Sequence, residues 1–134
     1  METAVADARR KVEANRNAQT EARLRRMSDL LAQWRKPPSP TPVKVQLQIL
    51  RIGQVAIVAM PGEPFAEIGA AIKKASPFEV TLFCGYSSGM GGDYMPIASE
   101  YAYGGYEVER TPYGTAAAGK IISEAIALYA EVKQ

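Results

Sequence analysis

Four prolines within six residues divide this chain into two parts, at the sequence Pro37-Pro38-Ser39-Pro40-Thr41-Pro42. Proline fixes the backbone φ angle and has no amide hydrogen to donate, so a helix cannot continue through such a segment. A proline-rich run instead favours an extended, stiff connector. We therefore expect a helical segment over residues 1–36, a linker over residues 37–42 and a separate folded unit over residues 43–134.

The segment before the prolines has the composition of one long helix. Residues 2–34 contain no glycine or proline and are rich in Ala, Arg, Glu and Gln, which are good helix formers. In the second half of this segment large apolar residues recur every three or four positions, at Leu24, Met27, Leu31 and Trp34. This spacing predicts an amphipathic helix that packs on the rest of the chain or on a partner, and a second copy of the chain is one candidate.

The helical segment is also basic. Residues 1–36 contain nine Lys or Arg and five Asp or Glu (net +4), whereas residues 37–134 contain seven and nine (net −2). A basic segment can bind nucleic acid through its phosphates. Here, however, Glu13, Glu21 and Asp29 interrupt the cluster, and no aromatic residues are interleaved with it. We therefore expect no nucleic-acid partner.

The sequence contains no recognisable export signal or membrane span. The first thirty residues lack the apolar stretch of a signal peptide, and no run approaches the length needed to cross a bilayer. The single cysteine, Cys84, cannot form a disulfide within the chain, so cysteine usage does not indicate a compartment. The localisation is left open.

The part after the prolines alternates between strand and helix periodicities. The expected elements are, in order, strands over 43–49 and 55–60 joined by a turn at Gly53-Gln54, a helix over 64–75, a strand over 78–84, a loop over 85–92 and a helix over 115–132. The whole chain is therefore predicted to be a mixed α/β protein, in which a long N-terminal helix and a connector precede a β-hairpin–α–β–loop–α unit.

The absence of histidine limits what this chain can do alone. Histidine is the commonest metal ligand and the usual acid–base group near neutral pH. A Ser-His-Asp triad, a Cys-His dyad or a histidine-built metal site cannot be completed from this chain's own residues.

Two places at the ends of predicted strands are candidates for a site. Glu63 follows the second strand, where α/β proteins commonly bind ligands, although a carboxylate there is also suited to capping the next helix. The glycine-rich loop over 85–92 could bring backbone amides to an anion, but its spacing matches neither a Walker loop nor the dinucleotide fingerprint, and a flexible surface turn explains it better. Six of the seven tyrosines lie between Tyr86 and Tyr113, which indicates a pocket wall or a wet interface.

Several short motifs in this region, taken in order, resemble the neutral/alkaline ceramidase family. They are Arg51-Ile52-Gly53-Gln54-Val55-Ala56, Pro61-Gly62-Glu63, Gly85 with Tyr94-Met95-Pro96, Glu100-Tyr101 and Tyr106-Glu107, while Ser76-Pro77-Phe78 and Gly104-Gly105 are similar to the shorter bacterial members. The resemblance extends from about Leu47 to Tyr113. It implies that residues 43–134 are the C-terminal third of a ceramidase-like catalytic domain.

The resemblance also implies an activity, namely zinc-dependent hydrolysis of the N-acyl bond of ceramide, a step of sphingolipid metabolism. The family holds zinc with two histidines, a glutamate and a tyrosine. Carried over, Glu63 and Tyr94 would be metal ligands, and Tyr106 would help to stabilise the tetrahedral intermediate. Zinc would polarise the amide and activate water, while a phenol donates to the oxyanion.

Both family histidines lie upstream of the matching region, so the zinc site would be incomplete in this chain. We therefore expect it to be inactive without an upstream segment of the same domain or another subunit. A different class of function is a non-catalytic module, which binds a lipid or another ceramide-like amphiphile or self-associates as a scaffold through the N-terminal helix.

Overall fold

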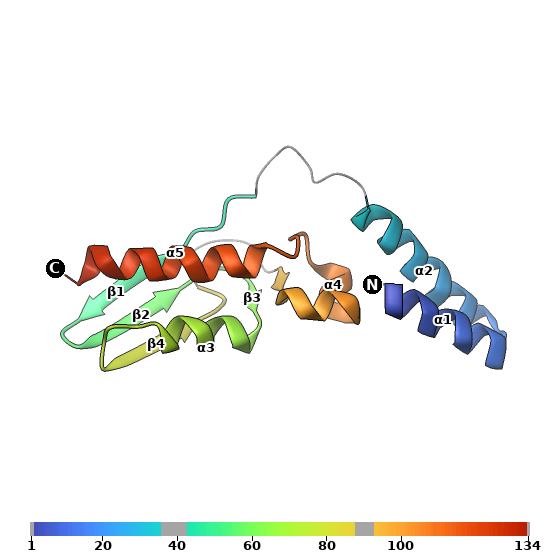
Figure 1. The fold of residues 1–134 in the computed structure, drawn as a ribbon, viewed down its shortest axis with the longest axis horizontal. Coiled ribbons are helices and arrows are strands. Elements are labelled where there is room, and N and C mark those ends of the chain that lie inside the picture. The colour runs from blue at the N-terminus through green and yellow to red at the C-terminus, as the bar shows by residue number, and fades with distance from the viewer. Residues whose placement is uncertain (1, 36–42, 88–92, 134) are drawn as a thin grey trace.

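The computed structural model describes residues 2–35, 43–87 and 93–133. It contains both helices and strands, so the predicted mixed α/β class is confirmed. Figure 1 shows a small sheet with the helices α3 (Ala66–Lys74) and α5 (Ala117–Val132) at one end of the molecule and a helical hairpin at the other. The predicted linker over residues 37–42 and much of the glycine-rich loop, residues 88–92, lie outside the described residues.

The sheet has three strands in the order β1-β2-β4. They are β1 (Gln48–Ile52), β2 (Val55–Ala59) and β4 (Val80–Cys84). The predicted hairpin is confirmed: β1 and β2 are antiparallel, and Gly53 in the turn adopts a φ of 59°, which glycine tolerates. The first strand begins later than predicted, because Gln48 pairs with Ala59 and β2 ends there. The β2 and β4 strands are parallel.

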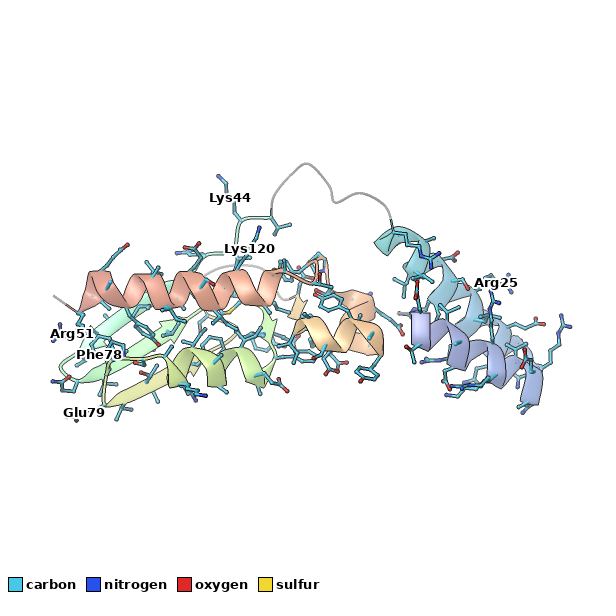
Figure 2. The ribbon with its side chains drawn as sticks, viewed as in Figure 1. Arg25, Lys44, Arg51, Phe78, Glu79 and Lys120 are labelled. Atoms are coloured by element: carbon cyan, nitrogen blue, oxygen red, sulfur yellow. The ribbon has the colours of Figure 1, made fainter. Side chains whose placement is uncertain are left out.

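The helices α3 and α5 pack on one face of this sheet (Figure 1). The core between them is built of Ala56, Val58, Met60, Ile68, Ile72, Met95, Ala118, Ile121, Ala125 and Tyr129. The Tyr129 hydroxyl donates to the Ile72 carbonyl at 3.2 Å and joins the two helices. At the far end of the sheet the Arg51 guanidinium lies over the Phe78 ring, 5.6 Å from its centroid (Figure 2).

The prediction of one continuous helix over residues 2–34 is wrong. The structure has two helices, α1 (Glu2–Ala14) and α2 (Ala18–Trp34), separated at Asn17. The Asn17 backbone is extended, its side chain accepts from the amides of Gln19 and Thr20, and the Thr20 hydroxyl accepts from the Asn17 amide, in a capping box. This cap satisfies amides that a new helix start would otherwise leave unpaired, and it lets α1 fold back on α2.

The helical hairpin packs on two short elements of the rest of the chain, the 3-10 helix η1 (Ala98–Ala102) and α4 (Tyr106–Arg110). Their shared core consists of Ala4, Val5, Ala8, Met27, Tyr101 and Val108, with Leu24, Leu30 and Leu31 at its margin. An ion pair of 2.9 Å joins Arg26 to Glu109. The amphipathic face predicted on the second half of the segment is therefore used within the chain, although self-association through this helix stays a prediction. The structure does not describe the Trp34 side chain.

None of the described helices is both long enough and apolar enough to cross a membrane.

Candidate functional site

The candidate site lies at the carboxyl ends of the parallel strands β2 and β4. Beyond β2 the chain forms the short strand β3 (Glu63–Pro64), which pairs in parallel with β5 (Tyr94–Met95). Glu63 is directly opposite Tyr94, and the Glu63 amide donates to the Asp93 carbonyl at 3.0 Å. Partners in a strand pair project their side chains to the same face. The two residues that the resemblance makes metal ligands are therefore neighbours.

Tyr86 reaches the same place from the end of β4. Its amide donates to the Gly62 carbonyl at 2.9 Å, and its φ of 52° is in the left-handed region that residues other than glycine seldom adopt. The chain approaches closely at the preceding residue: a Cβ on Gly85 would lie 3.0 Å from the Pro64 Cδ and 3.2 Å from the Gly62 oxygen. Such local backbone strain is typical of functional positions.

The Tyr86 hydroxyl donates a hydrogen bond to the Glu63 carboxylate. This bond, together with the negative charge of Glu63, raises the pKa of Tyr86 to about 12. The pKa of Tyr94 is also raised, first because its hydroxyl is partly desolvated and then because of the charge and hydrogen bonding of Glu63. At neutral pH the Glu63 carboxylate therefore accepts hydrogen bonds from the protonated phenols of Tyr86 and Tyr94.

Tyr106, the first residue of α4, completes the cluster. Its ring meets that of Tyr94 edge-to-face, with centroids 5.7 Å apart and an interplanar angle of 74°. This geometry is favourable for aromatic pairs. The Tyr106 side chain is 59% exposed, so its hydroxyl can be reached by a molecule from solution. The structure thus brings together Glu63, Tyr94 and Tyr106.

The alternative in which Glu63 caps the following helix is not observed. The N-cap of α3 is Phe65, and no side chain makes a capping hydrogen bond there. The Glu63 carboxylate interacts instead with Tyr86 and Tyr94. Tyr86 itself was not singled out by sequence reasoning. Its position in the sequence could have indicated it, because Tyr86 comes two residues after a predicted strand, as Glu63 also follows one, and ligands commonly bind at strand ends.

The donors in the described part of the chain do not fit a self-sufficient zinc site. Among those residues no group of three or more His, Cys, Asp or Glu is close enough together to hold a metal ion. Of the ligands that the resemblance implies, the described part supplies Glu63 and, directly opposite it, Tyr94. Zinc sites normally use three or four protein ligands.

No protein-family model, curated protein or solved structure matches this chain. The resemblance to ceramidases therefore stays a prediction that rests on the sequence motifs alone. The hypothesis of an anion cradle in the glycine-rich loop falls on residues 88–92, outside the described part.

Proposed function

We propose that this chain is part of an amidohydrolase similar to the neutral/alkaline ceramidases, inactive until histidines from another segment or subunit complete its site. The observation that carries this proposal is that three residues from separate motifs lie next to one another in the fold. Glu63, Tyr94 and Tyr106 lie in three separate motifs of the sequence. In the fold, Glu63 pairs with Tyr94, and the Tyr94 ring contacts that of Tyr106.

The chemistry of this cluster suits an N-acyl amide. A carboxylate accepts a hydrogen bond from an amide N–H, and a neutral phenol donates to a carbonyl oxygen. When the carbonyl is attacked, its oxygen becomes negative and the phenol's hydrogen bond strengthens, which lowers the barrier. Tyr106 is the best donor for this role because its side chain is largely exposed and Glu63 does not engage it. Glu63 acts on the other two phenols and holds their hydroxyls in place.

The surroundings of the site fit a substrate with both polar and apolar parts. Tyr86 and Tyr106 are 71% and 59% exposed. A tyrosine ring combines an apolar body with a polar tip, so exposed tyrosines can contact an acyl chain and an amide together. A ceramide-like amphiphile has both features.

The test adds the missing histidine ligands on a second polypeptide. The chain is assayed with a fluorogenic ceramide analogue in zinc-containing buffer, alone and mixed with the histidine-bearing N-terminal part of a ceramidase-family catalytic domain. We expect no turnover by the chain alone and measurable turnover by the mixture. In the mixture, Tyr106→Phe should lower kcat by about 10²–10³-fold, as removal of one oxyanion donor does.

The matched control is Tyr103→Phe, an equally exposed tyrosine three residues away that takes no part in the Glu63 cluster, and it should leave kcat unchanged. Glu63→Gln should remove activity. Hydrolysis by the isolated chain in metal-free buffer would overturn the proposal, as would full activity of the Glu63→Gln mixture.

A further inference from the structure

The Glu63 cluster (Glu63, Tyr86, Tyr94 and Tyr106) combines one carboxylate with three aromatic rings. Tyr94 is the strand partner of Glu63, and its ring meets that of Tyr106 at a centroid distance of 5.7 Å. The Tyr86 hydroxyl donates to the Glu63 carboxylate from the end of β4. The side chains of Tyr86 and Tyr106 are largely exposed. The cluster therefore presents aromatic surface and an anion together to a molecule in solution.

The charges that act on this cluster are negative. The charges of Glu63 and Glu107 act on the Tyr94 phenol, and that of Glu63 acts on the Tyr86 phenol. Both carboxylates are half-buried, and in the described part of the chain neither of them forms an ion pair. The described groups that act on the two phenols include no Lys or Arg. A half-buried carboxylate that no cation neutralises attracts a cation from solution.

The residue types select the kind of cation. A metal ion needs three or four closely placed ligands, and the described residues contain no group of three or more His, Cys, Asp or Glu that could hold one. The face of a phenol ring carries partial negative charge, and it attracts an organic ammonium ion through a cation–π contact. The hydrogens of that ion can bond to a carboxylate, which only accepts. Its carbon atoms can pack on the apolar bodies of the rings.

We propose that the Glu63 cluster is a binding site for an alkylammonium ion. The ammonium group bonds to the Glu63 carboxylate, and the alkyl chain lies against the exposed rings of Tyr86 and Tyr106. Binding requires neither zinc nor the upstream histidines, so it goes beyond the proposed function and does not depend on it. Because these rings are largely exposed, each cation–π contact is weak, and we expect a dissociation constant in the millimolar range.

The test is a titration of the full chain with hexylammonium at neutral pH, in buffer that contains a metal chelator. NMR of ¹³C-labelled tyrosine rings follows binding, and we expect saturable shifts for Tyr86, Tyr94 and Tyr106. Two molecules of the same chain length are the ligand controls. Neutral hexanol should bind at least about tenfold more weakly, because it forms no charge-assisted pair with Glu63. Hexanoate should not bind, because its charge has the same sign as that of Glu63.

Two variants separate the contribution of the charge from that of the rings. Glu63→Gln removes the charge at nearly constant size and should weaken hexylammonium binding about tenfold. Tyr106→Leu keeps an apolar side chain but removes the ring, and it should weaken binding about two- to fivefold. The matched control is Tyr103→Leu, which changes an equally exposed tyrosine outside the cluster and should bind like the wild type. Circular dichroism checks that each variant is folded.

Three results would overturn the proposal. They are the absence of a saturable shift in the wild type at tens of millimolar hexylammonium, hexanol binding as tight as that of hexylammonium, and unchanged binding by folded Glu63→Gln. The assay of the zinc-containing mixture is a separate experiment. A chain that binds hexylammonium while the mixture shows no turnover would support this inference and count against the amidohydrolase proposal. Turnover without hexylammonium binding would do the reverse.

Discussion

Glu63 and Tyr94, thirty-one positions apart in the sequence, are direct partners in the parallel strand pair β3–β5, which forms a second, two-stranded sheet. The pair is short, but hydrogen bonds continue on both sides of it, from the Glu63 amide to the Asp93 carbonyl and from the Phe65 amide to the Met95 carbonyl. This pairing fixes the carboxylate beside the phenols. The relative position of the two residues is therefore set by backbone hydrogen bonds.

The first prediction concerns the pKa of Tyr86. Replacing Glu63 with Gln removes the carboxylate that accepts from its hydroxyl, so the pKa of Tyr86 should fall from about 12 toward the ordinary tyrosine value near 10. NMR of ¹³C-labelled tyrosine across an alkaline titration measures this value residue by residue. The control is Glu67→Gln, an exposed carboxylate in the first turn of α3, which should not move it. An unchanged pKa in Glu63→Gln would contradict the hydrogen bond.

The same hydrogen bond predicts how stability depends on pH. The pKa of Tyr86 is higher in the folded chain than in the unfolded one, so folding favours the protonated phenol. Its contribution is fully present below about pH 10 and is lost as the pH rises toward about 12. Urea denaturation of wild type and Tyr86→Phe should therefore show a difference in stability that shrinks over this interval. A difference that grows with pH would contradict the assignment.

The second prediction concerns the break between α1 and α2. Asn17→Ala removes the side chain that accepts from two backbone amides and should cost about 1 kcal/mol of stability. Asn15→Ala is the matched control, because Asn15 contributes its backbone carbonyl to these hydrogen bonds and its side chain does not cap α2. Urea unfolding followed by circular dichroism gives both values. Equal losses of stability in the two variants would show that the Asn17 cap does not stabilise the start of α2.

The third prediction contrasts two helical glycines. A Cβ on Gly69 of α3 would lie 2.6 Å from the Phe83 Cδ1, so Gly69→Ala should destabilise the chain by about 1–3 kcal/mol despite its better helix propensity. Gly119 of α5 has nothing within 4 Å of its Cβ position, so Gly119→Ala should stabilise the chain by about 0.5–1 kcal/mol. Thermal unfolding measures both signs. A stabilising Gly69→Ala would show that α3 and β4 are not so closely packed.

The fourth prediction concerns the docking of the helical hairpin. Met27 is fully buried among α1, η1 and α4, so Met27→Ala should cost about 2–5 kcal/mol through lost contacts and a cavity. Leu30→Ala, at the margin of the same core, should cost less. Hydrogen exchange over residues 2–35 reports the loss directly. Unchanged protection in Met27→Ala would mean that the hairpin does not dock there.

Most of the secondary structure followed from local patterns. The strands β2 and β4 and the helices α3 and α5 were each predicted within about two residues, since apolar periodicity and Gly or Pro breaks mark them locally. The hairpin was predicted too, but its first strand β1 begins at Gln48 instead of Val43. The helix break at Asn17 was missed because the surrounding residues favour helix. The cap satisfies the first amides of α2 locally, whereas the packing of α1 back on α2 is a tertiary contact that local patterns do not show.

The candidate site was predicted in part. Glu63, Tyr94 and Tyr106 were chosen from motifs that resemble a family, and no composition or spacing argument indicated that they would meet. Tyr86 was missed because its role depends on a left-handed backbone and on the close passage of Gly85 beside Pro64. Both features depend on the contact between the segments that follow β2 and β4, which are far apart in the sequence.

The amino-acid sequence by itself determined the mixed α/β class, the proline-rich boundary and the absence of a histidine-based site within the chain, because these depend on residue identity and local order. Only the tertiary structure decided that Glu63 faces the tyrosines instead of capping α3, that Met27 is buried within the chain, and that one sheet face is uncovered. Each of these outcomes depends on pairings between segments far apart in the chain. Local periodicity shows which residues prefer burial, whereas long-range contacts decide what covers them.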